Sequence, residues 1–198
     1  ASLGMFAGRL LSEEAEPEQA GKALEVLDEI YPGNHFVPFF RGMMALGRGK
    51  GDEARSFFMA AEPLQPDDDS KALAAFYHAY SFSLEGAWDR ALPGFGRAAS
   101  LCPDMKEYRN MYGVSLFKLK RFAEAASEFE AILDRLDKGS VMDIQNLGMC
   151  HKELGNRELA GHFLRTALQI DPSLERAREA LQSLYDVDTL GNQARSDK

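Results

Sequence analysis

The cysteines and histidines are the side chains best suited to chemistry in this sequence. Cys150, His151 and His162 lie closest together in the chain, and side chains of these types bind metals or act as nucleophiles and bases. Neighbouring residues of a helix point about 100° apart, so Cys150 and His151 cannot easily share one metal ion. The sequence also lacks HExxH, paired CxxC, GxSxG and GxxxxGKS or GxxxxGKT motifs. We therefore expect no catalytic residue, no metal, no cofactor and no enzymatic activity.

Two polar loops are further candidates for chemistry. Three aspartates at 67–69 could contribute to a metal site, but acidic residues before an apolar helical stretch more often cap the helix. The turn GRGKGDE at 47–53 contains glycines and a lysine, yet no strand precedes it, as a phosphate-binding loop would require. We interpret both loops as solvated connections between helices.

The helical segments themselves repeat along the chain. In residues 108–133, the small residues Gly113 and Ala125 accompany the large residues Leu116 and Phe129. At intervals of 34 to 37 residues, the matching positions hold Gly148, Ala160, Ala91, Phe95, Ala54 and Phe58. Small residues let two helix backbones approach closely, and large ones fill the space between neighbouring hairpins. This interval is typical of stacked helix hairpins and not of propellers or leucine-rich repeats.

The pattern resembles that of the tetratricopeptide repeat (TPR) family. Residues 141–174 match it most fully, with Ile144, Leu147, Gly148, Gly155, Ala160, Leu164, Ala167 and Pro172. Departures from the pattern are His151 in that copy, Asp137 in place of a closing proline, and Arg41 at a usually apolar position. The resemblance implies an all-α fold, namely an α-solenoid (right-handed superhelix) of antiparallel helix pairs.

We predict one elongated domain with capped ends. The predicted parts are a degenerate N-terminal TPR-like helix pair at 1–34, TPR units at 35–68, 72–105, 106–139 and 141–174, a capping helix at 175–186 and a flexible tail at 187–198. The N-terminal pair comprises an apolar segment at 3–11 and a helix with Ala23, Leu27 and Ile30 on one face. Because Pro93 lacks a backbone donor, its helix is expected to start late or to bend there.

The resemblance also implies that a stripe on the first helix of each hairpin faces a concave groove. The stripe contains Phe36, Phe39, Met43 and Leu46, then Leu73, Phe76, Tyr80 and Ser83, then Glu107, Asn110, Val114 and Phe117, then Met142, Gln145, Met149 and Lys152. It is apolar near the N-terminus and becomes more polar along the chain. Aromatic and methionine side chains suit the docking of an amphipathic helix or an extended apolar peptide.

The candidate peptide-binding residues are therefore Phe36, Phe39, Met43, Phe76, Tyr80, Asn110, Val114, Phe117, Gln145 and Met149. The alternative is that these residues pack against neighbouring helices or are covered by residues 1–11. Members of the family that bind a terminal carboxylate use lysine, arginine and asparagine at set groove positions. In one register those positions hold Phe39, Met43, Tyr77, Glu107 and Met111, and in the next Phe76, Tyr80, Met111, Met142 and Asn146. Neither set supplies the positive charges that a carboxylate needs, so we do not expect that function.

Composition restricts the choice of partner. A net charge of −8 disfavours nucleic acid, whose binding depends on clustered lysine and arginine. The densest apolar run, LAAFYHAYSF, is shorter than the ~20 residues that a membrane span needs. Cys102 and Cys150 fall in different predicted units and are expected to stay unpaired, which fits a reducing, cytoplasmic location. The chain opens on Ala1 without a methionine, so we expect a piece of a longer protein or a tag remnant.

These observations favour a non-catalytic protein–protein interaction module, an adaptor or scaffold that binds a partner peptide or helix in its concave groove. One alternative is a secretion-type chaperone that shields an apolar client segment. Another is the regulatory arm of a larger enzyme. A second copy of the chain could also fill the groove, which would give a homo-oligomer.

Overall fold

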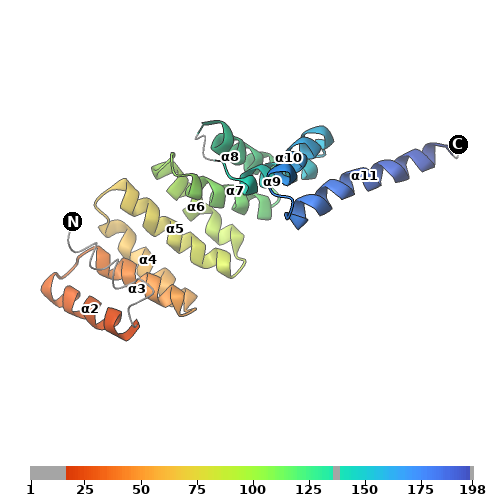
Figure 1. Cartoon of the computed structure of the whole chain (residues 1–198). Helices are drawn as coiled ribbons and strands as arrows, with labels where there is room; N and C mark the ends of the chain where they lie inside the picture. The colour runs from red at the N-terminus through yellow and green to blue at the C-terminus, as the bar shows by residue number, and fades with distance from the viewer. Residues whose placement is uncertain (1–16, 136–138, 197–198) are drawn as a thin grey trace. The chain divides into compact units, whose positions relative to one another are not determined.

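The protein is built from helices joined by short turns. The computed structural model describes residues 17–135 and 139–196, and no strand occurs among them. The helices are α2 Pro17–Ile30, α3 Phe36–Gly47, α4 Gly51–Ala61, the 3₁₀ turn η1 Glu62–Leu64, α5 Asp68–Leu84, α6 Trp88–Leu101, α7 Lys106–Lys118, α8 Phe122–Arg135, α9 Val141–Glu153, α10 Arg157–Ile170 and α11 Glu175–Ser196 (Figure 1). The predicted segment at 3–11 lies outside the described residues.

The chain divides into two compact units, 1–103 and 104–198. In the first unit, α3 packs on α4, α4 on α5 and α5 on α6, while α2 contacts α3 (Figure 1). In the second unit, α7 packs on α8, α8 on α9, α9 on α10 and α10 on α11. Each unit is therefore a stack of antiparallel helix pairs. Among the described helices, none is both long enough and apolar enough to cross a lipid bilayer.

In three hairpins, α3–α4, α7–α8 and α9–α10, a glycine on the first helix packs against a large residue on the second. A methyl group on Gly42 would lie 2.6 Å from the Phe58 ring, and one on Gly113 would lie 3.0 Å from the Phe129 ring. A methyl group on Gly148 would likewise lie 3.0 Å from Leu164. Phe58, Phe129 and Leu164 are fully buried. The predicted close approach of helices at Gly113 and Gly148 is confirmed, because contacts this close leave no room for a side chain at the glycines. The large residues were predicted to fill the space between neighbouring hairpins, whereas Phe58 and Phe129 pack against the glycine of their own hairpin.

The joint between α4 and α5 depends on a buried arginine. The Arg55 guanidinium donates to Glu85 Oε1 at 2.8 Å and to Asp52 Oδ1 at 2.5 Å. It also lies 4.6 Å from the centre of the Phe82 ring. Because Arg55 is on α4 whereas Phe82 and Glu85 belong to α5 and its C-terminal cap, this cluster fixes one helix pair against the next.

The turns between paired helices require a left-handed residue. Gly49, Gly86 and Gly155 occupy this position with φ between 71° and 77°, whereas Lys120 takes it in the turn between α7 and α8 with φ 61°. A residue with a β-carbon pays roughly 1–2 kcal/mol in this conformation. The α7–α8 turn therefore has local strain that the other turns avoid.

Replacing Lys120 with glycine is expected to relieve that strain. Part of the gain is lost because glycine is more flexible in the unfolded chain, so we expect the free energy of unfolding to rise by about 0.5–1 kcal/mol. Urea denaturation monitored by circular dichroism measures the change. Lys120→Ala, which removes the charge but keeps the β-carbon, should leave stability nearly unchanged; an equal gain from alanine would refute the strain.

Helix α6 runs without interruption from Trp88 to Leu101 with Pro93 inside it. Of the two expected alternatives, the late start does not occur, and a bend at Pro93 remains a prediction. The helix tolerates Pro93 near its first turns, where a single backbone hydrogen bond is lost. The adjacent Gly94 is the point of closest approach to α5: a methyl group on it would lie 2.8 Å from Ala79 Cβ and 3.0 Å from the Ala75 carbonyl oxygen.

The ends of the described chain differ from the sequence prediction. On α2, Ala20 and Leu24 are buried, whereas Ile30 of the predicted apolar face is 61% exposed. The reason is that α3 packs on the Ala20 and Leu24 side of α2. Helix α11 continues to Ser196, beyond the predicted end of the cap at residue 186, and residues 197 and 198 are outside the described residues. No proline interrupts it, and a single glycine costs only about 1 kcal/mol in a helix. The boundaries of the predicted TPR units remain a prediction.

Candidate functional site

In the first unit, the helices α3 and α5 carry seven large apolar side chains of the predicted stripe. We call this set the aromatic face: Phe36, Phe39, Met43 and Leu46 of α3 with Leu73, Phe76 and Tyr80 of α5. Leu73 is 37% exposed and the other six are partly exposed. Within α5, the Phe76 and Tyr80 rings stack with their centres 6.1 Å apart and an angle of 7° between planes. The face thus offers apolar surface to solvent or to a partner.

Buried rings beneath the aromatic face hold it in place. The Phe39 ring lies 5.8 Å from Phe58 and 5.8 Å from Tyr77, and Tyr77 stacks on Phe58 at 6.0 Å. In the next hairpin, the Phe76 ring meets Phe95 edge to face at 5.3 Å. Phe58 and Phe95 are fully buried, so their own positions are fixed. Their contacts therefore hold the partly exposed rings of Phe39 and Phe76 in one orientation.

In the second unit, helix α11 covers part of the predicted stripe. Met149 is only 9% exposed and packs with Leu164, Ala177 and Ala180, while Phe117 contacts the same cluster. The Arg176 guanidinium of α11 lies 5.6 Å from the centre of the Phe117 ring. The apolar side of the capping helix therefore occupies the surface that the sequence assigned to a partner, and Met149 is not available for binding.

Polar members of the predicted set link helices of the second unit. Asn110 Nδ2 of α7 donates to Asp143 Oδ1 of α9 at 2.5 Å. The other oxygen of Asp143, which is 2% exposed, accepts from the Ser140 backbone N–H and hydroxyl, each at 2.7 Å. Asn110 therefore joins α7 to the start of α9, and this hydrogen bond gives it a structural role. Val114 lies one turn further along α7 and is half-buried.

Gln145 is also buried, with 2% of its surface exposed, and its Oε1 has no hydrogen-bond partner in the described structure. A buried acceptor without a donor costs about 1–3 kcal/mol. Gln145→Met keeps the length of the side chain and removes the acceptor, so we expect the free energy of unfolding to rise by about 1 kcal/mol. Thermal denaturation measures this. Gln145→Ala, which leaves a cavity instead, should destabilise the protein; stabilisation by both variants would contradict this reason.

The candidate chemical residues are not arranged as a reactive centre. Burial raises the pKa of the Cys150 thiol to about 12. The pKa of the Cys102 thiol is raised to about 11, mainly by burial and then by the hydrogen bond to Asp69. His151 is buried and stacks on Phe163, with ring centres 5.6 Å apart. Among the described residues, no group of three or more histidine, cysteine or acidic side chains is placed to hold a metal ion.

The raised thiol pKa values predict how stability depends on pH. An unfolded thiol ionises near pH 8.5, whereas the folded thiols stay protonated to about pH 11 or above. Their contribution to stability is therefore complete below pH 8.5 and is lost as the pH rises toward 11. We expect the urea midpoint to fall less between pH 7.5 and 9.5 in Cys102→Ala than in the parent. Equal falls would show that Cys102 is not protected in this way.

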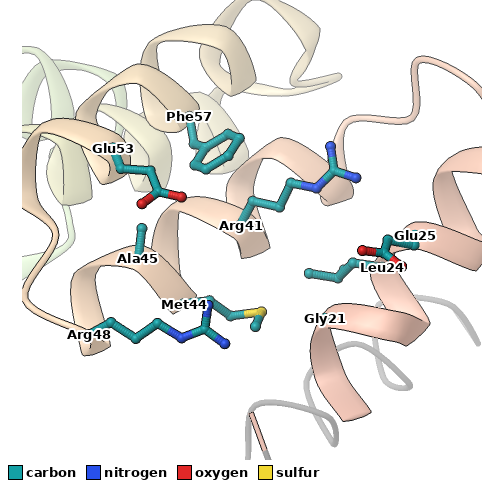
Figure 2. Close-up of a pocket in the computed structure, with 9 residues that line it drawn as sticks. All are labelled: Gly21, Leu24, Glu25, Arg41, Met44, Ala45, Arg48, Glu53 and Phe57. Atoms are coloured by element: carbon teal, nitrogen blue, oxygen red, sulfur yellow. The ribbon is translucent and has the colours of Figure 1, made fainter. Parts of the chain in front are cut away.

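A pocket of about 240 Å³ lies between α2, α3 and α4, away from the aromatic face. Its lining residues are Gly21, Leu24, Glu25, Arg41, Met44, Ala45, Arg48, Glu53 and Phe57. Figure 2 shows the side chains of Arg41, on α3, and of Arg48, just after α3, both reaching toward α2. Arg41 also pairs with Asp28 at 3.2 Å. This pocket does not follow from the sequence pattern, because its residues become neighbours only when α2 packs against α3.

Comparisons with known proteins agree with this architecture. Residues 144–174 match the family model of the tetratricopeptide repeat. No curated protein matches the chain. Among solved structures, the chain is similar to YrrB, described as a TPR protein with an unusual peptide-binding site (24% identity, 89% of each chain covered, TM-score 0.75). It is also similar to MamA from Desulfovibrio magneticus RS-1 (15% identity, 86% of this chain and 94% of that one, TM-score 0.71). A tetratricopeptide repeat protein from Parabacteroides merdae shares 17% identity over 98% of this chain and 75% of its own, with a TM-score of 0.74.

The stacked helix pairs and the structural neighbours define the fold class as an all-α solenoid of antiparallel helix pairs. Residues 144–174 are a tetratricopeptide repeat by their match to that family model, and the fold of the described residues is that of TPR proteins of known structure.

Proposed function

We propose that this protein is a non-catalytic adaptor or scaffold that binds an apolar peptide or helix of a partner on the aromatic face. The observation that carries the proposal is the face itself. Seven large apolar side chains from two neighbouring helices are partly exposed, and none of the seven is charged. Apolar side chains that remain exposed side by side often mark interaction sites.

The rigidity of the face supports binding over simple exposure. Phe39 and Phe76 rest on the buried rings of Phe58 and Phe95, so a partner would meet side chains that are already ordered. Preorganised side chains lose less conformational entropy on binding. YrrB, a structural neighbour, is described as having a peptide-binding site, which is consistent with this use of the fold.

A secretion-type chaperone is the second candidate, and the uncharged character of the face favours it. A chaperone would bind many apolar segments with little regard to their order, whereas an adaptor would bind one sequence well. Peptides selected from a displayed random library distinguish the two. A shared sequence motif supports an adaptor, and enrichment of apolar residues without a motif supports a chaperone.

The same peptides test the binding surface. Leu73→Gln/Tyr80→Gln changes two α5 members of the face that have no ring contact with Phe58 or Phe95 above, and should weaken the affinity for a selected peptide at least tenfold, or about 1.4 kcal/mol. Met59→Gln is the matched control, since Met59 is apolar, 65% exposed and on α4 of the same unit. Fluorescence anisotropy measures the affinities. If the double variant binds as tightly as the parent while remaining folded, the proposed surface is wrong.

A further inference from the structure

The inference concerns which partner the aromatic face fits, and it rests on the proposed function. The N-terminal ends of α3 and α5 lie at one edge of the first unit. Gln65, just before α5, donates from Nε2 to the carbonyl oxygen of His35, just before α3, at 3.2 Å. Phe36 and Leu73 are the members of the face nearest to that edge in their helices. The aromatic face therefore has a definite end, at the N-terminal ends of α3 and α5.

That edge is acidic. Asp67, Asp68 and Asp69 are exposed at the start of α5, and Asp69 lies one helical turn before Leu73 on the same side of the helix. Hydrogen bonds from the Ser70 backbone and side chain lower the pKa of the Asp67 carboxyl, so it remains ionised near neutral pH. Lys71 Nζ lies 3.4 Å from Asp68 Oδ1 and offsets one of the three charges. The Cys102 thiol, which donates a hydrogen bond to Asp69, is neutral and therefore offsets none of the three negative charges.

The charge of the unit as a whole has the same sign. Residues 1–103 contain fifteen acidic and nine basic side chains, so most of the net charge of −8 belongs to this part of the sequence. A partner with negative charge beside its apolar residues would be repelled, and one with positive charge would be attracted.

The aromatic face also limits the backbone conformation of its partner. An extended peptide leaves its N–H and C=O groups without partners unless the receptor supplies donors and acceptors. The Tyr80 hydroxyl is the one side-chain polar group of the seven residues. A helix forms its own backbone hydrogen bonds and presents apolar side chains at steps of three and four residues. It therefore loses no backbone hydrogen bonds when it binds such a surface.

From these observations we propose that the partner is an amphipathic helix whose apolar stripe covers the aromatic face and whose one end carries lysine or arginine residues beside Asp67, Asp68 and Asp69. The apolar stripe provides the affinity. The basic end sets the orientation of the helix along the face and excludes acidic segments.

The test uses three fluorescent peptides with the same leucine stripe at helical spacing. The first ends in three lysines, the second ends in three glutamates, and the third carries the lysines but has two prolines within the stripe. At low salt, the lysine peptide is expected to bind about tenfold more tightly than the glutamate peptide. In 0.5 M salt, this preference should shrink to about twofold because the charges are screened. The proline peptide is expected to bind at least tenfold more weakly than its helical counterpart.

Two protein variants locate the charge effect. Asp68→Lys reverses a charge at the acidic edge and is expected to reduce the preference for the lysine peptide to about twofold. Asp89→Lys makes the same change in net charge in the first turn of α6, at the opposite end of the α5–α6 hairpin, and should preserve the preference. Urea denaturation of both variants verifies that they fold.

The outcomes separate this inference from the proposed function. The lysine and glutamate peptides could bind the parent protein equally well and both lose affinity in Leu73→Gln/Tyr80→Gln. That result would contradict the proposed basic end of the partner helix but would still support the aromatic face as the binding surface. Equal effects of the two charge reversals would overturn the placement at residues 67–69. Equal binding of the proline peptide would overturn the helix. Binding that the Leu73→Gln/Tyr80→Gln variant does not weaken, or no binding of any peptide, would contradict the proposed function itself.

Discussion

Phe58→Ala is expected to lower the free energy of unfolding by about 3–5 kcal/mol. The ring is fully buried, fills the space beside Gly42 and supports both Phe39 and Tyr77. Its removal loses the transfer free energy of the ring and leaves a cavity that a rigid helix pair cannot close. Because the Phe39 ring then loses the ring it packs against, peptide binding on the aromatic face should weaken as well. Urea denaturation gives the first quantity and anisotropy titration the second.

The neighbouring residue provides the control. Met59 is 65% exposed on the same helix, so Met59→Ala should change stability by no more than about 0.5 kcal/mol. A loss below about 1.5 kcal/mol for Phe58→Ala would show that the space between the helices can collapse, and the account of the core would be wrong.

Gly94→Val is the second substitution with a large expected effect. The α-carbon of Gly94 is so close to α5 that even a methyl group would press on Ala79 Cβ and the Ala75 carbonyl oxygen. A branched side chain must push the two helices apart, which we expect to cost about 2–3 kcal/mol. The shift in the thermal midpoint measures this cost.

Gly47→Val is the matched substitution, because a β-carbon at the last residue of α3 meets no atom within 4 Å. Its effect should stay within about 0.5 kcal/mol, since valine has a better helix propensity than glycine and no contact to disturb. Equal losses from the two substitutions would mean that the cost arises from backbone conformation and not from the contact with α5.

The fold was largely predictable because its rules are local and repeated. Residues such as Phe58, Phe95 and Phe129 recur at a nearly constant interval, and each occupies the same buried position in its hairpin. The structure of the first and last described helices, α2 and α11, was harder to predict from the sequence. The side of α2 that is buried depends on how α3 meets it, and the continuation of α11 to Ser196 depends on the absence of a helix-stopping residue. The strain at Lys120 was not predictable either, because the sequence shows that this turn has no glycine but does not show the positive φ angle of the residue in its place.

The candidate site was predictable only in part. The positions of Phe36, Phe39, Met43, Phe76 and Tyr80 on α3 and α5 follow from helical spacing, and Phe39 of α3 contacts Tyr77 of α5. Burial of Met149 does not follow from spacing, because α11 covers it through contacts with Ala177 and Ala180. Asn110 has the spacing of a contact residue, yet its amide bonds to Asp143. Spacing places a residue on a side of a helix, whereas neighbouring elements decide whether that side is exposed.

Site-specific photo-crosslinking tests the central claim most directly. A photoreactive phenylalanine analogue is placed at position 80, on the aromatic face, or at position 59, on the exposed side of α4, and each protein is irradiated in lysate of the source cell. The account predicts a discrete adduct from position 80, absent from position 59 and suppressed by the lysine-tailed helical peptide. An adduct that forms only from position 59, or none from position 80, would contradict the assignment of the aromatic face as the binding surface.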